Sequence, residues 1–373
     1  MRIGIDSRTL TFPELRGIAN YILEILKNWP ESNDEFVLFY EDGQLSSNIV
    51  SPAKITSVKV PEPPGTRFKS WNWIAMPLAL KKVNIDLIWC PANIPIPFTR
   101  RRQILTVHDT LLQEPFRKHS PFNNIFYRYI VPYWTRQFAD EIITVSNFSR
   151  KRIDIFFKLN PNKINVIYNG LPSVDKQFSS KREAQNNLFQ NGIISGKYIY
   201  ALGAESYWKN TELLLKSFAM VHEDYPNLSL VISGIQNFAL EKYRQMASDL
   251  GLNSAIKLIK FVDSVTRNTL YQGAEIFIYP SLFEGFGFPP LEAMALGCPV
   301  IASDNASIPE VVGNAAYSVD CTHAYNLSSA IIILMEDVIK RRELINRGYK
   351  NISNFSWQKS ARLHRKVFEQ GSL

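Results

Sequence analysis

The sequence predicts an α/β protein built from two doubly wound domains in series, and three observations carry this prediction. The chain has 373 residues, which corresponds to two domains at about 150 residues each. Short β-branched runs alternate with longer amphipathic segments almost throughout, as in parallel βαβ units. The alternation pauses once, over the polar stretch 173–191, where we place the interdomain linker. We therefore expect one parallel sheet on each side of it.

The strands are predicted where short apolar, β-branched runs lie between turn-forming residues. Before the linker these runs are 2–5, 35–40, 55–60, 87–89, 104–107, 141–145 and 164–168. After it they are 198–202, 229–233, 256–261, 276–279, 300–302 and 316–319. Sheets of this kind bind ligands beyond the carboxyl ends of their strands.

Three further segments are assigned from the spacing of their apolar residues. Residues 17–29 place Ile18, Tyr21, Ile22, Ile25 and Leu26 on one helical face. The tail 354–369 also has apolar positions at roughly helical spacing. Residues 65–82 mix cations with aromatic rings, and fit a core helix with basic ends slightly better than a segment on a membrane or in a pocket.

The composition is that of a globular enzyme and excludes several other classes. Hydrophobic residues make up 46% and charged residues 20%, which is ordinary for a folded domain. The longest apolar stretches, 73–80 and 330–335, are shorter than the roughly 18–20 residues that cross a bilayer. The three widely spaced cysteines fit a reducing compartment, and no signal peptide precedes the first strand. We expect a cytoplasmic protein whose membrane contact, if any, is peripheral.

The net charge of +8 is concentrated in the first half of the chain. Residues 1–175 hold 22 basic and 16 acidic residues, against 20 and 18 in the remainder, and include basic runs at 100–102 and 150–152. One interpretation is attraction to an anionic membrane surface or nucleic acid. The other is a set of solvated surface faces, and the charge alone does not separate the two.

The strongest functional signal is the stretch 279–300, which reads as strand, glycine loop, helix and strand. Gly285 and Gly287 allow the backbone to approach a ligand closely. Pro289 fits a helix start, and Gly297 fits its end. A loop that enters a helix beyond a parallel strand presents N–H groups and a positive dipole end to an anion. We predict a phosphate site here.

Two carboxylates, Glu284 and Glu292, flank this loop with seven residues between them. An ionised carboxylate only accepts hydrogen bonds and therefore suits paired hydroxyls on either side of a bound phosphate. Taken alone, Glu292 is equally well explained as a favourable charge at a helix N-terminus, worth about 0.3–1 kcal/mol, and Glu284 as an exposed loop residue. The pair in this glycine and proline context favours a ligand site.

The stretch Glu284-Gly-Phe-Gly-Phe-Pro-Pro-Leu-Glu292 resembles the E-x7-E signature of the retaining glycosyltransferases of family four. Weaker matches follow the family's order at 4–6, 17–21, 86–88 with Pro91, 106–109, 145–149, 169–170, 208–210, 308–313 and 355–357. The resemblance implies the GT-B fold, in which two Rossmann-like domains face each other across a cleft. It implies an acceptor-binding domain of residues 1–175 plus a C-terminal helix at about 354–373, and a nucleotide-sugar-binding domain of residues 190–353.

The resemblance also implies a donor site. Its residues would be Gly17, Lys209, Val262, Glu284, Gly285, Phe286, Gly287, Leu291 and Glu292. Glu284 would hold the sugar hydroxyls, Glu292 the ribose, and Lys209 would neutralise the leaving diphosphate. The backbone at 285–287 would meet the sugar, that at 290 and 291 would border the phosphates, and that of Val262 would contact the base. Without the resemblance, Lys209 is better explained as a solvated lysine that opens a helix.

The catalytic residues implied are His108, Asp109, Lys209 and Glu284. His108 would lie beside the sugar, although a histidine after a buried strand is by itself more typical of a structural role. A leaving-phosphate oxygen is expected to take the acceptor proton, assisted by His108 or Asp109. Because the chain has no Asp-x-Asp motif, we expect no metal, and we expect no cofactor because the nucleotide sugar is a substrate.

Two departures from the family pattern concern the anion site. Trp208 and Ala204 stand where the family often has arginines, so that Lys209 would carry the diphosphate charge nearly alone. Ala19 and Asn20 replace a glycine and an arginine in the early loop. This weakens the expectation of phosphate contact by that loop, although Gly17 is retained.

The predicted function is transfer of a hexosyl unit from a UDP- or GDP-sugar, with retention, to a glycan or lipid-diphosphate-linked sugar acceptor. The setting implied is cell-surface polysaccharide synthesis in the cytoplasm, with peripheral contact at the inner membrane face left open. Nucleic acid is not an expected partner, because no RNA-binding, zinc or helix-turn-helix motif is present. A sugar-nucleotide epimerase or a phosphorylase on the same fold remains an alternative.

Overall fold

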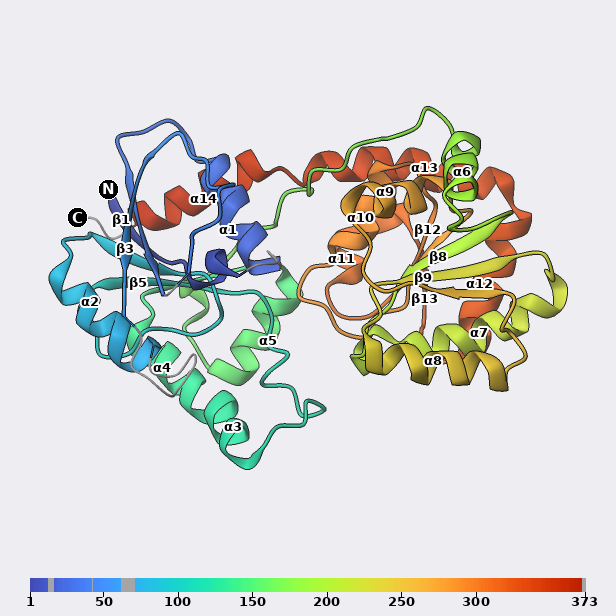
Figure 1. Cartoon of the computed structure of the whole chain (residues 1–373). Coiled ribbons are helices and arrows are strands. Elements are labelled where there is room, and N and C mark those ends of the chain that lie inside the picture. The colour runs from blue at the N-terminus through green and yellow to red at the C-terminus, as the bar shows by residue number, and fades with distance from the viewer. Residues whose placement is uncertain (13–16, 42, 62–70, 371–373) are drawn as a thin grey trace. The chain divides into compact units, whose positions relative to one another are not determined.

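A computed structural model describes residues 1–12, 17–41, 43–61 and 71–370. The chain forms two compact units, one of Met1–Gly170 with Ser356–Leu373 and the other of Leu171–Phe355. The first unit therefore includes a segment that follows the second unit in sequence. Figure 1 labels the elements of both units.

Within the described residues, the first unit is built on a parallel sheet of seven strands in the order β3-β2-β1-β4-β5-β6-β7. Its strands are β1 (Arg2–Asp6), β2 (Glu35–Tyr40), β3 (Lys54–Lys59), β4 (Leu87–Cys90), β5 (Arg102–Val107), β6 (Glu141–Thr144) and β7 (Ile164–Val166). Each lies where the sequence predicts a strand, with ends that differ by a residue or two. The first half of the strand prediction is confirmed.

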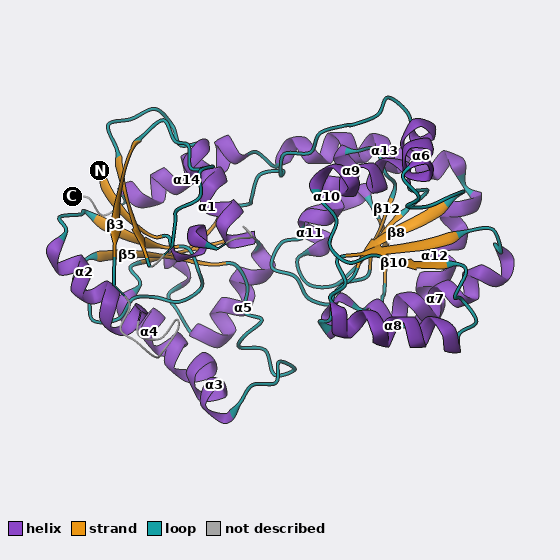
Figure 2. Cartoon of the chain, in the orientation of Figure 1, coloured by secondary structure: helices purple, strands orange, loops and turns teal. Residues whose placement is uncertain are grey.

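Helices surround this sheet, as Figure 2 shows. They are α1 (Gly17–Lys27), α2 (Met76–Lys82), α3 (Pro121–Ile125), α4 (Val131–Phe138), α5 (Asn147–Phe157) and α14 (Trp357–Glu369). The helices predicted at 17–29 and in the tail are thereby confirmed as α1 and α14. Since helices bury both faces of a parallel sheet, its strands read as continuous apolar runs, and the four central residues of β2 are indeed fully buried.

The second unit has a parallel sheet of six strands within the described residues, in the order β10-β9-β8-β11-β12-β13. Its strands are β8 (Tyr198–Leu202), β9 (Ser229–Ser233), β10 (Ile256–Leu258), β11 (Phe277–Tyr279), β12 (Val300–Ser303) and β13 (Tyr317–Val319). All six predicted strands are present. Only β10 ends three residues early, although Ile259 and Lys260 still form single backbone bonds of 2.8 Å with Ile232 and Gly234.

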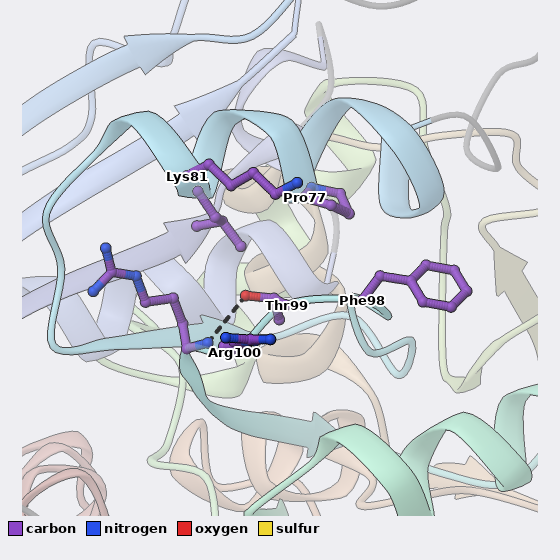
Figure 3. Close-up of a pocket in the computed structure, with 7 residues that line it drawn as sticks. Pro77, Lys81, Phe98, Thr99 and Arg100 are labelled. Carbon is purple, nitrogen blue, oxygen red and sulfur yellow. Dashed lines mark hydrogen bonds between the residues drawn. The ribbon is translucent and has the colours of Figure 1, made fainter.

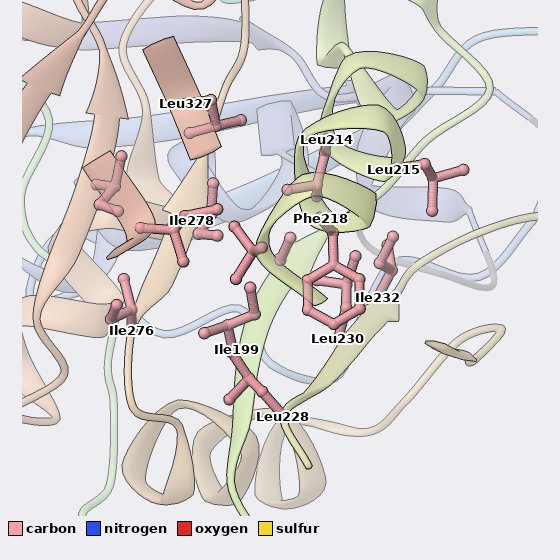
Figure 4. Packing of buried hydrophobic residues seen from close by; sticks show 14 of the residues in the cluster. Ile199, Leu214, Leu215, Phe218, Leu228, Leu230, Ile232, Ile276, Ile278 and Leu327 are labelled. Carbon is pink, nitrogen blue, oxygen red and sulfur yellow. The ribbon is translucent and has the colours of Figure 1, made fainter. Parts of the chain in front are cut away.

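The helices of the second unit are α6 (Lys181–Gln190), α7 (Thr211–Asp224), α8 (Asn237–Asp249), α9 (Ser264–Gly273), α10 (Phe288–Ala295), α11 (Ile308–Val312), α12 (Ala324–Glu336) and α13 (Val338–Asn351). Part of the core lies between the sheet and α7, where Leu214, Leu215 and Phe218 pack with the strand residues Ile199 and Leu230 (Figure 4). All five side chains are at most 1% exposed. Their continuous burial makes this sheet a rigid base for the loops that leave it.

The polar stretch 173–191 is not a linker throughout, which corrects the sequence interpretation. Residues from Lys181 to Gln190 form α6, capped by Ser180, whose side chain accepts the N–H of Glu183. Ala184 and Leu188 are fully buried, and Gln185 donates to the Gly273 carbonyl of α9 at 2.8 Å. The helix was missed because two buried positions among polar residues produce little apolar periodicity.

Both sheets have a point at which the strand order reverses, and these points locate the candidate sites. In the second unit β8 and β11 are neighbours, with β9 on one side and β12 on the other. In the first unit β1 and β4 hold the corresponding position. The loops after such a pair diverge, and ligands bind in the crevice between them at the carboxyl ends of the strands.

Asp34 joins α14 to the start of β1. Its buried carboxylate accepts bonds from the Met1 amino group at 2.7 Å and from Arg365 Nε at 2.9 Å. Burial alone would raise the pKa of Asp34, but these two cations, with Ser32 and Trp29, hold it well below the usual range. The ionised carboxylate therefore stabilises the fold.

Replacing Asp34 by asparagine is expected to lower the thermal midpoint at neutral pH and to change its pH dependence. Because the folded-state pKa is depressed, the stabilisation is fully present above the unfolded pKa of about 4 and is lost as the pH falls below it. Midpoints of wild type and variant should therefore differ by a constant amount above about pH 5 and converge in more acidic buffer. Parallel curves down to pH 3 would contradict this.

Candidate functional site

The candidate site in the second unit is built from the segments that follow β8 and β11. After β8 the chain passes through a short loop and the 3₁₀ turn Tyr207–Lys209 into α7, and after β11 it forms the loop 280–287 that enters α10. The two loops are tied together, since the Trp208 carbonyl accepts the Leu282 N–H at 2.7 Å and lies 3.1 Å from the Ser281 hydroxyl oxygen. Residues far apart in sequence thus meet at one sheet edge.

Lys209 and Glu284 form an ion pair at this edge. Lys209 Nζ lies 2.6 Å from Glu284 Oε1 and 3.2 Å from the Tyr279 hydroxyl, and it also sits 5.2 Å from the centre of the Tyr279 ring. The side chains are 26% and 17% exposed, so water screens the pair only in part. Burial and the neighbouring Glu284 carboxylate raise the pKa of Tyr279, which therefore remains a neutral hydroxyl.

Two buried serines fix the loop that carries Glu284. The Ser281 hydroxyl donates to Glu284 Oε1 at 2.6 Å, which orients the carboxylate toward Lys209. The Ser307 hydroxyl lies 2.9 Å from the carbonyl oxygens of both Glu284 and Phe286. Both serines are fully buried, so the loop conformation is set by the protein interior.

The entry into α10 has the geometry of an anion site with few donors. Gly287 precedes the helix with φ of 111°, a backbone region that favours glycine. The next residues are Phe288, Pro289 and Pro290, and the two prolines carry no N–H. Leu291 is fully buried, and helical geometry directs its N–H to a carbonyl within the helix. The helix therefore offers an anion mainly its dipole and the backbone of the preceding loop.

Glu292 has its own partners, which differ from those of Glu284. Only 7% of Glu292 is exposed, and its Oε2 accepts the Tyr271 hydroxyl at 3.1 Å and lies 3.7 Å from Arg267 Nε of α9. Burial and the Glu292 charge raise the pKa of Tyr271. Oε1 of Glu292 has no hydrogen-bond partner among the described residues, so the carboxylate retains capacity to accept hydroxyls.

Val262 lies between β10 and α9. It is half-buried, whereas the preceding Phe261 is 82% exposed. The following residue, Asp263, caps α9 by accepting the Thr266 N–H at 2.7 Å. The Val262 backbone therefore lies directly before the start of α9, the helix that also carries Arg267 and Tyr271. Its contact with a base remains a prediction.

The predicted residues of the first unit are Gly17, His108 and Asp109. His108 follows β5 and is half-buried, and its Nε2 lies 2.8 Å from the Pro91 carbonyl. Burial lowers the pKa of His108 to about 4, so that the ring is neutral near pH 7. Asp109 Oδ1 accepts the Leu111 N–H at 2.9 Å. Gly17 is the exposed first residue of α1.

Residues 15–173 match the family model described as Glycosyltransferase Family 4, and residues 184–351 match the one described as Glycosyl transferases group 1. The chain is 31% identical to the O-antigen chain mannosyltransferase RfbU of Salmonella typhimurium over 272 residues. This alignment covers 72% of this chain and 71% of the relative. This chain belongs to glycosyltransferase family four. The O-antigen chain mannosyltransferase B of Escherichia coli is 28% identical to this glycosyltransferase over 275 residues, with 73% and 71% of the two chains covered.

The fold has equally extensive structural relatives. HepE of Anabaena in complex with UDP and glucose aligns with 99% of this glycosyltransferase and 99% of its own chain, at a TM-score of 0.75 and 18% identity. The two parallel sheets and this likeness show the GT-B fold expected from the signature. The family match also makes the protein a hexosyltransferase.

Several residues of the glycosyltransferase site have no counterpart in the sequence predictions. Ser281 and Ser307 support the Glu284 loop, and Arg267 and Tyr271 support Glu292. Ser281 could have been found as a polar residue directly after a buried strand, and Arg267 with Tyr271 as an i, i+4 pair on one helix face. Ser307 is 23 residues from Glu284 along the chain, and nothing in its local sequence indicates the contact.

Among the residues that the structure describes, there is no group of three or more histidine, cysteine, aspartate or glutamate side chains that could hold a metal ion. In the same residues, no helix combines the length and the apolar character that crossing a bilayer requires.

Proposed function

We propose that the enzyme transfers a hexosyl unit from a nucleotide-diphosphate sugar to an acceptor hydroxyl with retention at the anomeric carbon. The observation that carries this is the contact of 2.6 Å between Lys209 and Glu284. In the donor, one C1–O–P linkage joins the sugar to the diphosphate. A lysine that binds the diphosphate and a carboxylate that binds the sugar must therefore be neighbours if both act on one donor. Lys209 and Glu284 meet this condition.

Negative charge that develops on the departing diphosphate would be stabilised by Lys209 and by the dipole of α10. Lys209 can exchange part of its contact with Glu284 for a phosphate oxygen while keeping the carboxylate close. Glu292, which has a separate set of partners, would hold the ribose through its Oε1. The fixed loop 280–287 makes these groups preorganised, which is what electrostatic stabilisation requires.

The covalent change involves two bonds at one carbon. The bond from C1 to the diphosphate oxygen breaks, the bond from C1 to the acceptor oxygen forms on the same face, and the acceptor proton passes to an oxygen of the departing phosphate. His108 is neutral at physiological pH, because its pKa is lowered to about 4 by burial. It would therefore act as a hydrogen-bonding group toward the sugar, with Asp109 assisting.

The sugar favoured by the relatives is mannose, since the two curated relatives described above are mannosyltransferases. Their names also favour a glycan acceptor of the O-antigen type. We propose UDP- or GDP-activated hexoses as donors, contacted at the base by the Val262 backbone, and no metal ion in the transfer step. EDTA at millimolar concentration should leave the rate unchanged.

A donor screen tests this function directly. Purified enzyme would be combined with UDP-glucose, GDP-mannose, ADP-glucose and TDP-glucose, and thermal shift and nucleotide release would be measured. Raised midpoints with one donor, and a product whose anomeric configuration by NMR equals that of the donor, are the expected results. An inverted product would contradict retention, and no stabilisation by any of these donors would contradict the proposed site.

A lipid-linked acceptor would require contact with a membrane surface. We propose that the protein surface beside α2 in the first unit makes this contact. The part of the 65–82 prediction that is described, residues 71–82, is only partly a core helix. Trp71 and Met76 are fully buried, but Ile74 and Leu78 are 49% and 52% exposed. Residues 65–70 lie outside the described residues. Exposed apolar side chains on this segment are typical of helices that lie on a membrane surface.

A hollow of about 530 Å³ adjoins α2, lined by Pro77, Leu80, Lys81, Phe98, Thr99, Arg100 and Arg101. Figure 3 shows Lys81 on the helix above Thr99 and Arg100, with the ring of Phe98 at one end. Phe98 is 66% exposed, and Lys81 and Arg100 are exposed as well. Apolar side chains flanked by cations match the acyl and anionic headgroup layers of a bilayer.

Lys81→Ala combined with Arg100→Ala is expected to weaken binding to vesicles of anionic phospholipid by about thirtyfold, since each of the two cations near such a surface contributes about 1 kcal/mol. Cosedimentation with anionic and with purely zwitterionic vesicles measures this. Arg342→Ala combined with Lys350→Ala removes the same charge from exposed positions of α13 and is the matched control. Equal loss in both double variants would indicate net charge alone and reject the α2 surface.

A further inference from the structure

Behind His108, the first unit contains a chain of buried polar groups that the proposed reaction does not use. Trp89 Nε1 donates to Thr106 Oγ1 at 2.9 Å, and Thr106 Oγ1 lies 3.4 Å from the Tyr21 hydroxyl. The Tyr21 hydroxyl lies 2.5 Å from His364 Nε2, and His364 Nδ1 lies 2.8 Å from the Ser360 carbonyl. The four side chains come from β4, β5, α1 and α14, and none is more than 2% exposed.

The two ends of this chain fix the direction of every bond within it. An indole N–H can only donate and a carbonyl can only accept, so Trp89 donates at one end and the Ser360 carbonyl accepts at the other. His364 therefore carries its proton on Nδ1 and accepts through Nε2. Tyr21 donates to His364 and accepts from Thr106. Burial raises the pKa of Tyr21 and lowers that of His364 to about 4, so both are neutral in this arrangement.

Tyr21 is also in direct contact with His108. The two rings meet edge to face, with centroids 4.7 Å apart and planes at 84°. The Pro91 carbonyl can only accept, so His108 carries its proton on Nε2, which lies 2.8 Å away. The Nδ1 atom of His108 has no hydrogen-bond partner among the described residues, and it is accessible to solvent. It is therefore the nitrogen that a ligand can reach.

We propose that Tyr21 and His364 are positioning residues for His108, which lock its ring so that the unprotonated Nδ1 faces the substrate. His364 fixes the Tyr21 hydroxyl, and the Tyr21 ring fixes the plane of the His108 ring. The device makes α14 part of the catalytic machinery of the first unit although it follows the second unit in sequence. The catalytic consequence rests on the proposed function, because it assumes that His108 contacts the transferred sugar.

A purely structural role does not account for the chemistry of these positions. Tyr21 and His364 lie among Trp89 and Phe368 in an aromatic cluster, which apolar rings would fill equally well. A buried hydroxyl or imidazole costs stability unless every polar atom is bonded. A fully directed chain of hydrogen bonds instead supplies one unique orientation of the Tyr21 ring, which packing of a phenylalanine would not enforce.

The histidine ring nitrogens report the proposed lock without any assay of activity. The chain has only five histidines, so selective ¹⁵N-histidine labelling of the full-length protein allows His108 and His364 to be identified through His108→Gln and His364→Gln variants. Wild type should show His108 with a proton on Nε2 and His364 with a proton on Nδ1. Tyr21→Phe and His364→Leu should release the His108 ring, loosen its Nε2–H bond to the Pro91 carbonyl, and so give a mixture of tautomers at His108. Unchanged His108 signals in both variants would overturn the proposal.

Steady-state kinetics provide the second readout. Tyr21→Phe and His364→Leu are expected to lower kcat by about tenfold with donor KM within about twofold, because a small misplacement of a reacting group slows the chemical step. His364→Gln retains an acceptor near the Tyr21 hydroxyl and should recover most of the rate. Tyr198→Phe, which removes another buried hydroxyl that donates to a backbone carbonyl, is the matched control and should leave kcat unchanged.

The NMR and kinetic measurements distinguish the positioning of His108 from the proposed catalytic role of His108. If His108→Gln retains wild-type kcat while Tyr21→Phe still shifts the His108 tautomer, the proposed role of His108 is wrong and the positioning stands. If kcat falls in Tyr21→Phe and Tyr198→Phe alike, the effect is one of stability and the positioning is rejected.

Discussion

Lys209→Ala is expected to lower kcat for sugar transfer by about 10²–10³, which is the usual cost of removing one preorganised group that stabilises developing charge. The expected loss is large because two prolines remove N–H donors from the first turn of α10, which leaves Lys209 as the main group for the diphosphate charge. Release of nucleotide in the presence of donor and acceptor measures the effect. Circular dichroism should show an unchanged fold, since the lysine side chain is partly exposed.

The ion pair makes the effects of Lys209 and Glu284 interdependent. Glu284→Gln should itself slow transfer by orders of magnitude, and the double variant should lose much less than the product of the two single effects, because each residue holds the other. Lys242→Ala is the matched control, since Lys242 pairs with Glu212 at an exposed position of the same unit. Wild-type turnover in both single variants would exclude these residues from the site.

Asp6→Ala is expected to lower the free energy of unfolding of the first unit by about 3–5 kcal/mol, because it removes the carboxylate that neutralises a buried arginine. Asp6 ends β1 and accepts bonds from Arg8 Nε at 3.0 Å, Arg8 Nη2 at 2.8 Å and Trp71 Nε1 at 3.2 Å. The side chains of Asp6 and Arg8 are 3% and 6% exposed. At about 2–4 °C per kcal/mol for a unit of this size, the thermal midpoint should fall by about 10 °C.

Two comparison variants make this result interpretable. Glu343→Ala breaks the exposed ion pair with Arg347 and should cost less than about 1 kcal/mol. Asp6→Leu combined with Arg8→Met removes both buried charges and should restore part of the lost stability. A midpoint for Asp6→Ala within error of Glu343→Ala would mean that the buried pair does not hold the end of β1.

Most of the fold could be predicted because burial on both faces of a parallel sheet imposes a local pattern. Every strand was predicted from its own apolar run, and α1 and α14 from the spacing of their apolar residues. Failures occurred where burial is sparse. The helix α6 buries only Ala184 and Leu188 fully, and the segment 71–82 combines a buried Trp71 with an exposed Leu78, so neither has the full apolar face by which helices are recognised.

The candidate site was predictable to a different extent. Glu284 and Glu292 were predicted from the loop and helix pattern and from the signature, and Lys209 from the wider family resemblance. The contact between Lys209 and Glu284 was not predicted, because the two are 75 residues apart along the chain. The same holds for the contact between Ser307 and the Glu284 loop. Hydrogen bonds of this kind depend on which strands become neighbours, and the order of strands in a sheet has no local record in the sequence.

The sequence by itself determined the two-domain α/β class, the strand positions and the carboxylate signature, because these depend on local hydrophobic pattern and on adjacent residues. Only the tertiary structure decided that Lys209 neutralises Glu284, that Tyr271 and Arg267 hold Glu292, and that His364 lies behind His108 through Tyr21. These contacts arise because parallel strands bring distant loops to one edge and α14 returns to the first unit. Long-range packing then determines which side chains become partners, and the sequence around each residue does not indicate its partner.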